Sequence, residues 1–200
     1  GFISDYFPNC SSIIEAQYRV TNNPSIAHPG FTPCGDHTSG SGDMMIVNGA
    51  LNPLLRVWYL DNIPVTPYTN YEFSFWFTSV VSASPAKLQM FINGHTAGNI
   101  CQSPTDTCRW KKCCYTWYSD TSTIANISIR DLNLLGPGND FALDDISLKE
   151  TVTCLYQKTV TVTVTPGNPT TFSPVSAICS GDALSALPTT SNNGTTGTWS

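Results

Sequence analysis

The sequence predicts an all-β fold of the jelly-roll sandwich type. Helical periodicity is nearly absent, and about nine short runs with strand-like patterns are separated by turn residues. That number of short antiparallel strands is expected of a β-sandwich or jelly roll. The chain has 200 residues, of which 40% are hydrophobic, which is enough for a packed core.

The expected strands follow one another within residues 1–150. The first, 17–21, alternates and stops at Asn22-Asn23-Pro24. The run 87–92 leads into Asn93-Gly94, a favoured hairpin turn. The other expected strands are 43–48, 55–60, 63–65, 71–81, 115–118, 124–129 and 141–148.

Alternation in residues 71–81 separates two kinds of side chain, because neighbours on a strand point to opposite faces of the sheet. One face carries Tyr71, Phe73, Phe75 and Phe77. The other face carries Glu72, Ser74, Trp76 and Thr78.

The charges and the lengths of the apolar runs argue against two classes of partner, nucleic acids and membranes. Only 12% of residues are charged, the net charge is -5, and no basic patch is larger than Lys111-Lys112, so we expect no nucleic acid partner. No run of about 18 apolar residues is present, so we expect no membrane insertion. The chain begins at Gly1 without Met, and we expect it to be a mature or excised piece of a longer protein.

The eight cysteines favour disulfides in an extracellular compartment over a zinc site, because no CxxC pair occurs. Spacing leaves the connectivity open, although the loop from Cys101 to Cys108, with Pro104 inside it, could close locally. The candidates are Cys10, Cys34, Cys101, Cys108, Cys113, Cys114 and Cys154.

The composition changes after Glu150. Residues 159–165 (TVTVTVT) alternate strictly, and residues 166–174 (PGNPTTFSP) have the composition of a linker. We therefore predict a jelly-roll domain over 1–150, a strand and linker over 151–175, and the start of a second β module over 176–200.

Two acidic motifs suggest a calcium site. Asp36 precedes a Gly/Ser-rich loop, and alternation places Asp144 on the face of Ala142, Ile146 and Leu148, pointing inward. A buried carboxylate needs a partner, and calcium takes six to eight oxygen ligands from carboxylates and carbonyls. The open alternative is that the Asp and Thr side chains cap their own turn. The predicted ligands are Asp36, Asp144, Glu15 and the loop at Gly42.

The pair "DHTSGSGDMMIV" and "FALDDISL" resembles the MAM domain and the calcium-containing jelly rolls of carbohydrate-binding modules. It also resembles domains in large surface proteins of gliding gram-negative bacteria, which implies an adhesin that reaches the surface by type IX secretion. The resemblance implies a structural calcium shared by Asp36 and Asp144. The tail 178–200 resembles the opening of an immunoglobulin-like repeat, which implies a partner for Cys179 beyond Ser200.

Aromatic side chains supply the expected ligand-binding feature. Trp110, Tyr115, Trp117 and Tyr118 lie next to Lys111-Lys112, and flat aromatic faces with a polar group suit sugars. The alternative is that Tyr115 and Trp117 belong to the core.

Catalysis is not expected. The chain contains no G-x-S-x-G, no H-E-x-x-H and no Gly-rich phosphate loop. Asp144 and Asp145 do not suit a glycosidase pair, because strand neighbours diverge whereas a retaining pair lies about 5 Å apart facing one substrate.

The expected function is a non-catalytic extracellular module of a cell-surface adhesin. It would recognise a glycan or a protein partner, be stabilised by calcium and disulfides, and adjoin neighbouring repeats of the same chain. The alternatives are a carbohydrate-targeting module of a secreted hydrolase and a structural spacer in a surface filament.

Overall fold

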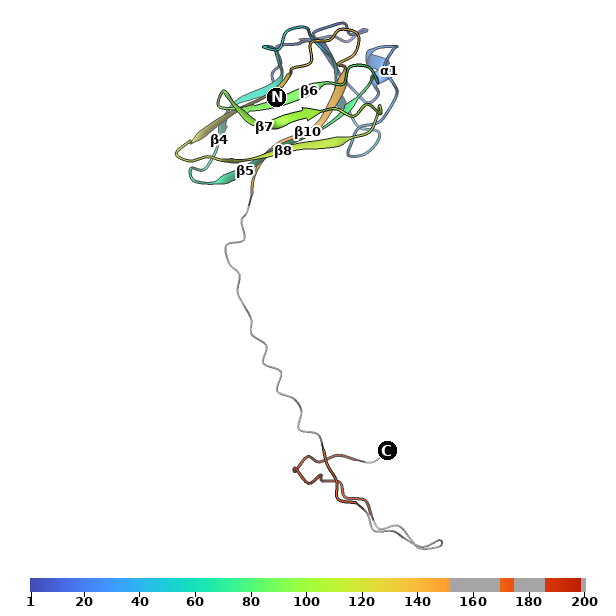
Figure 1. The fold of residues 1–200 in the computed structure, drawn as a ribbon, viewed down its shortest axis with the longest axis vertical. Helices are drawn as coiled ribbons and strands as arrows, with labels where there is room; N and C mark the ends of the chain where they lie inside the picture. Colours follow the sequence, from blue (N-terminus) through green and yellow to red (C-terminus); the bar gives the residue numbers. More distant parts are fainter. Residues whose placement is uncertain (152–169, 175–185, 199–200) are drawn as a thin grey trace. The chain divides into compact units, whose positions relative to one another are not determined.

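The computed structural model describes residues 1–151, 170–174 and 186–198, and its strands confirm the all-β prediction (Figure 1). The chain divides into two compact units, Gly1–Cys154 and Leu155–Ser200. The elements are β1 (Phe7–Pro8), β2 (Gln17–Thr21), α1 (Pro24–Ala27), β3 (Met44–Asn48), β4 (Arg56–Pro64), β5 (Asn70–Ser79), β6 (Lys87–Ile92), β7 (His95–Gln102), β8 (Lys111–Tyr118), β9 (Ile124–Asp131) and β10 (Phe141–Glu150).

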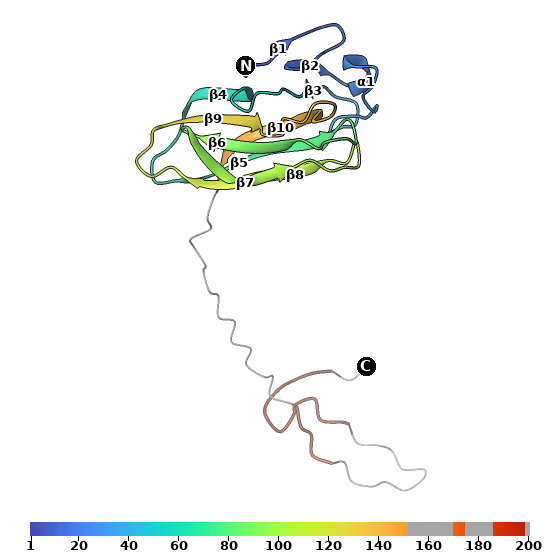
Figure 2. The same ribbon diagram turned by 45° about the horizontal axis from the view of Figure 1, so that its top comes forward.

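The strands form two sheets with a common core between them (Figure 2). The six-stranded sheet has the order β1-β2-β3-β10-β5-β8, and the four-stranded sheet has the order β4-β9-β6-β7. From β3 to β10 the chain changes sheet at every connection except the β6–β7 hairpin. This crossing pattern makes the first unit a jelly-roll sandwich.

The alternation predicted for β5 is confirmed. Phe73, Phe75 and Phe77 are fully buried in the core between the sheets, whereas Glu72 and Trp76 point the other way and are partly exposed. Burying each phenylalanine contributes about 1.5–3 kcal/mol relative to leaving it in water. This central strand therefore fixes which face of the six-stranded sheet is inner and which is outer.

A second apolar cluster covers part of the outer face, by which we mean the face of the six-stranded sheet turned away from the four-stranded sheet. Ile13, Ala27 and Phe31 pack there against side chains of two strands and of the residue that follows β5. These side chains are Met44 and Ile46 of β3, Ala142 of β10, and Val80, which follows β5. The segment before β3 thus closes one half of the outer face and leaves the other half open.

Four strands differ from the prediction, since β1 was not expected and β8 begins at Lys111 rather than at residue 115. The runs 55–60 and 63–65 belong to one strand, β4, because a bulge between Leu60 and Ile63 interrupts its pairing with β9 while the strand continues. β7 was not predicted, because this edge strand is mostly exposed and has no clear alternation. The Asn93-Gly94 turn that leads into it is confirmed, with φ of 50° and 81°.

Two disulfides join distant parts of the first unit. Cys34 pairs with Cys108, and Cys101 on β7 pairs with Cys113 on β8. The local closure of Cys101 with Cys108 is therefore wrong, because β8 brings Cys113 opposite Cys101 at the edge between the sheets. The thiols of Cys10 and Cys114 are exposed and form no disulfide with a described residue. Cys154 and Cys179 lie outside the described residues.

The second unit is described only in short pieces. Thr190 and Thr196 form a β-bridge around a turn in which Gly194 has a φ of 81°. The predicted strand at 159–165 and most of the predicted linker lie outside the described residues, as does the start of the predicted repeat.

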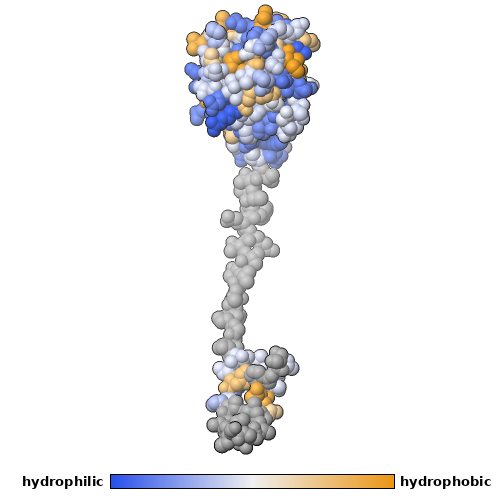
Figure 3. Space-filling model, turned by 90° about the vertical axis from the view of Figure 1, so that its right-hand side faces the viewer, coloured by the Kyte–Doolittle hydropathy of each residue, from blue (hydrophilic) through white to orange (hydrophobic). Residues whose placement is uncertain are grey.

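The surface of the first unit mixes polar and apolar residues on the face shown in Figure 3, where hydrophobic residues gather toward one end. Exposed large hydrophobic side chains include those of Ile14, Leu51, Leu54 and Leu135. Within the described residues, no helix is long and apolar enough to cross a membrane.

The buried aromatic face of β5 gives a stability prediction. Phe75→Ala should lower the free energy of unfolding by about 3–5 kcal/mol, because it leaves a cavity between the sheets. Urea denaturation measures this, with Glu72→Gln on the opposite face of the same strand as the control. A loss below about 1 kcal/mol for Phe75→Ala would contradict its place in a tightly packed core.

Candidate functional site

The open half of the outer face contains a hollow of about 560 Å³, which we call the outer-face hollow. Three neighbouring strands supply its side chains, since β5 lies between β8 and β10. Its lining residues are Glu72, Ser74 and Trp76 from β5, Lys112 from β8, and Asp145, Ile146, Ser147 and Lys149 from β10. The outward residues of the three strands lie side by side, because Ser74 pairs with Cys114 on one side and with Ser147 on the other.

The polar groups of the outer-face hollow include both signs of charge. Lys112 Nζ lies 2.6 Å from Glu72 Oε1, and both side chains are more than one third exposed. The hydrogen bond from Lys112 lowers the pKa of Glu72, and the charge of Lys149 adds to that effect. An exposed ion pair of this kind contributes little to stability, so the two groups remain available to a ligand.

Trp76 lies where the open and covered halves of the outer face meet. The imidazole of His37 stacks on its indole, with ring centroids 3.6 Å apart and an interplanar angle of 15°. Trp110 meets His37 edge-on at 6.0 Å and donates its Nε1–H to the carbonyl of Gly35 at 3.2 Å. The loop before β3 therefore covers one face of Trp76.

The predicted divergence of Asp144 and Asp145 is wrong. A bulge in β10 follows Asp144, and Asp145 has a φ of 48°. The Asp144 carboxylate accepts from His37 N at 2.9 Å, and Asp145 Oδ2 accepts from Thr38 Oγ1 at 2.6 Å and lies 2.8 Å from His37 Nδ1. Both carboxylates therefore hold the same loop.

The same bulge explains why Asp144 does not point into the core. One extra residue shifts the alternation of the strand. As a result, Ile146 and Leu148 pack against the same central cluster as Phe141 and Leu143. The predicted grouping of Asp144 with Ile146 and Leu148 on one face is wrong for this reason.

Asp36 caps its own loop. Its carboxylate accepts hydrogen bonds from Ser39 N at 2.9 Å and from Gly42 N at 2.7 Å, and Ser39 Oγ donates as well. These bonds, that from Ser39 N first, lower the pKa of Asp36 to about 2. This is the turn-capping alternative that the sequence left open.

The surroundings of the predicted ligands do not fit one calcium ion. Calcium needs oxygen ligands, whereas the Asp36 and Asp144 carboxylates face N–H groups of Ser39, Gly42, His37 and Asp145. Glu15 is exposed, and its charge adds to the effect of burial, which raises the pKa of Asp140. Across the described ranges, no three His, Cys, Asp or Glu side chains converge on a point that suits a metal.

The four predicted ligand-binding aromatics do not share one site. Trp110 belongs to the outer face, beside His37. Trp117 packs against the core and lies 6.0 Å from Tyr71, while Tyr115 lies over Gly98 on β7. Tyr115, Trp117 and Tyr118 line a separate hollow of about 340 Å³, which we call the edge hollow. The aromatic cluster seen in the sequence is divided because Trp110 precedes β8, whereas the other three lie at the far end of that strand.

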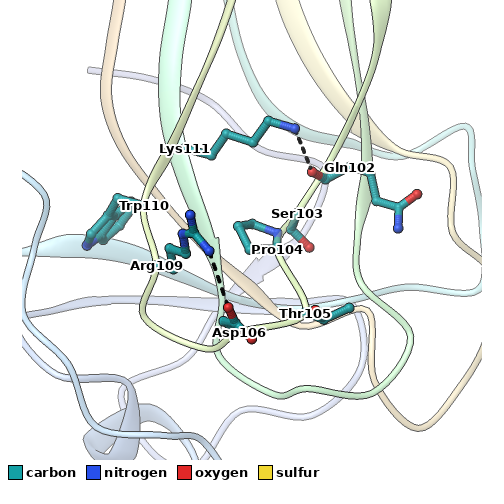
Figure 4. A pocket seen from close by; sticks show the side chains of 8 residues that line it. All are labelled: Gln102, Ser103, Pro104, Thr105, Asp106, Arg109, Trp110 and Lys111. Carbon is teal, nitrogen blue, oxygen red and sulfur yellow. Dashed lines mark hydrogen bonds and ion pairs between the residues drawn. The ribbon is translucent and has the colours of Figure 1, made fainter.

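A third hollow, of about 550 Å³, lies in the loop between β7 and β8 (Figure 4). Arg109 Nη1 lies 3.4 Å from Asp106 Oδ2, and Lys111 Nζ donates to the carbonyl of Gln102 at 3.4 Å. Disulfides at Cys101 and Cys108 attach this loop to β8 and to the loop before β3. Its basic groups are thus engaged within the loop itself.

Comparison with known proteins gives structural likeness alone. No protein-family model and no curated protein matches the chain. Among solved structures, the EclA C-terminal domain, a sugar-binding protein, is 13% identical, with a TM-score of 0.43 over 47% of this chain and 66% of that one. The CBM22-1 xylan-binding domain of Paenibacillus barcinonensis Xyn10C is 12% identical, with a TM-score of 0.46 over 75% and 85%.

A third similar structure contains the CBM22-1 and GH10 modules of the Clostridium thermocellum xylanase 10B in complex with xylohexaose. It is 10% identical, with a TM-score of 0.42 over 62% of this chain and 24% of that one. At these identities and scores, the assignment of the fold rests on the two sheets and their connections.

The capping role of Asp36 gives a pH prediction. Its folded pKa of about 2 lies below the usual aspartate pKa of 3.8. The carboxylate therefore stabilises the fold fully above about pH 4 and loses that effect as the pH falls toward 2. The difference in unfolding free energy between the wild type and Asp36→Asn should therefore shrink between pH 5 and 2.5 in urea titrations. Asp106→Asn, in an exposed ion pair, is the control, and a difference that stays constant with pH would contradict the capping role.

Proposed function

We propose that the first unit is a non-catalytic glycan-binding module of an extracellular protein, and that the glycan lies in the outer-face hollow. The observation that carries this proposal is the row of polar side chains from β8, β5 and β10, with Trp76 at one end. Binding sites for small ligands combine such hydrogen-bonding groups with apolar surface.

The side chains of the hollow match the hydrogen-bonding needs of sugar hydroxyls, which both donate and accept. Lys112 and Lys149 donate, the Glu72 carboxylate accepts, and the hydroxyls of Ser74 and Ser147 do both. Trp76 adds the part of its indole that His37 leaves uncovered, and aromatic surface suits the C–H face of a sugar ring.

The shape of the site favours an oligosaccharide over a single sugar. The outward residues of β5 from Glu72 to Trp76 span about 14 Å at roughly 3.4 Å per residue. They stand on a central strand that is hydrogen-bonded on both sides, so they are held in place before the ligand arrives. Such preorganisation lowers the cost of ordering the site on binding.

The two disulfides support an extracellular location, because such bonds persist in oxidising compartments. Membership of a large surface adhesin with neighbouring repeats follows from the sequence resemblance and is part of the proposal. In that setting the module would attach a cell or a filament to a glycan. A targeting module of a secreted hydrolase would use the same hollow.

The edge hollow is a second candidate for the ligand site. Tyr118 is 52% exposed and Tyr115 is 36% exposed, and the polar residues Asn93, His95 and Asp120 share the hollow with them. Exposed aromatic rings beside hydrogen-bonding groups are the feature that supports this alternative.

Screening the 200-residue chain on a glycan array, followed by calorimetry with the strongest hits, tests the proposal. Trp76→Ala and Lys149→Ala should each weaken binding at least about tenfold, which corresponds to about 1.4 kcal/mol. Tyr118→Ala, in the edge hollow, should leave the affinity unchanged.

The reverse pattern, with loss of binding in Tyr118→Ala alone, would place the ligand in the edge hollow. An array without any hit would contradict glycan binding and favour a protein partner or a structural spacer. Trp76 also packs against His37. If Trp76→Ala unfolds for that reason, the affinity of Lys149→Ala tests the proposal.

A further inference from the structure

One lysine in the outer-face hollow has no acidic partner. Lys149 lines the hollow from β10, is exposed, and pairs through its backbone with Glu72 on β5. Among the described side chains, no Asp or Glu forms an ion pair with Lys149. Its ammonium group can therefore form a charge-assisted hydrogen bond with an acid that a ligand supplies.

Glu72, which lies opposite Lys149, is already engaged by other groups of the protein. Lys112 Nζ lies 2.6 Å from Glu72 Oε1. The hydrogen bond from Lys112 lowers the pKa of Glu72, and a hydrogen bond with the Ser74 hydroxyl and the charge of Lys149 add to that effect. Glu72 is thus ionised at neutral pH, and its single negative charge faces two ammonium groups, one from each neighbouring strand.

The Lys112 side chain lies lengthwise in the hollow. Its backbone pairs with that of Trp76, but its ammonium group contacts Glu72, which is four residues earlier on β5. Four residues of a strand span about 14 Å at roughly 3.4 Å per residue. The ammonium groups of Lys112 and Lys149 therefore both act at the Glu72 end of the hollow, where they exceed the charge of Glu72 by one.

The Trp76 end of the hollow has the opposite charge. Asp145 Oδ2 accepts from Thr38 Oγ1 at 2.6 Å and lies 2.8 Å from His37 Nδ1, and the imidazole of His37 stacks on Trp76. The hydrogen bonds from Thr38 and His37 hold the pKa of Asp145 below its usual range. A second acid on a ligand would therefore meet a negative charge at this end.

The floor between the two ends carries hydroxyl groups. Ser74 Oγ and Ser147 Oγ lie 3.3 Å apart, on strands that pair with each other. Each hydroxyl can donate and accept a hydrogen bond. This part of the hollow suits the neutral hydroxyls of a sugar.

We propose that the outer-face hollow takes an acidic glycan, with one carboxylate or sulfate ester at the Glu72 end and a neutral sugar against Trp76. This inference rests on the proposed glycan site and adds the class of sugar that the site recognises. A lysine ammonium is a compact point charge without the fork of an arginine, so it suits either acidic group. The charge of Asp145 and the net charge of -5 disfavour a glycan that is acidic on every sugar.

The test compares oligosaccharides that share the linkages of the strongest array hit and end in glucose, in glucuronic acid or in glucose 6-sulfate. The 200-residue chain should bind the two acidic forms at least about tenfold more tightly than the glucose form, because hydrogen bonds between charged groups are the stronger ones. Calorimetry at about 20 mM and about 500 mM NaCl should show that salt reduces this preference, since it screens exposed charges. The same oligosaccharide with a uronic acid at every position should bind less tightly than the singly acidic form.

Variants locate the charge that gives the preference. Lys149→Gln keeps a hydrogen-bond donor but removes the charge, so it should bind the acidic and neutral forms with similar affinity. Lys87→Gln, which removes the same charge from an exposed position on β6, is the matched control and should keep the preference. Glu72→Gln should increase the preference, because it leaves both ammonium groups without the counter-charge of Glu72.

The outcomes separate this inference from the function on which it rests. Similar affinity of the wild type for all three forms would overturn the acidic ligand and leave glycan binding intact. A preference that persists in Lys149→Gln would also overturn it, by placing the acidic group elsewhere on the surface. An array without any hit would contradict the proposed function itself, and this inference with it.

Discussion

The burial of one aromatic row on β5 determines most of this architecture. Phe73, Phe75 and Phe77 enter the core between the sheets, which turns Glu72, Ser74 and Trp76 outward on the same strand. Because β5 lies between β10 and β8, the outward residues of all three strands share a surface. The proposed glycan site therefore lies on the same sheet as the hydrophobic core, on its opposite face.

Sequence reasoning predicted the parts of the fold that depend on simple alternation. The faces of β5, the extent of β2 and β6, and the Asn93-Gly94 turn all follow from local patterns. β7 was missed because an exposed edge strand is under no pressure to alternate. Disulfide connectivity depends on how β7 and β8 meet, which no local pattern reports.

The sites were harder to predict than the fold. The sequence did single out Asp36, Asp144 and their neighbours, but the bulge after Asp144 reverses which faces the later residues occupy. A bulge has no sequence signal of its own here. Its presence brings both aspartates into contact with the loop at His37, which the sequence did not predict.

Core and surface side chains alternate strictly along β5, and this alternation affects how the surface of the domain can change by mutation. Even-numbered residues from 72 to 76 face the outer surface, and odd-numbered ones from 73 to 77 belong to the core. Substitutions at the even positions alter the surface chemistry while the packing between the sheets stays intact. Point mutation at Glu72 or Ser74 can therefore change the surface chemistry of the domain on an unchanged core.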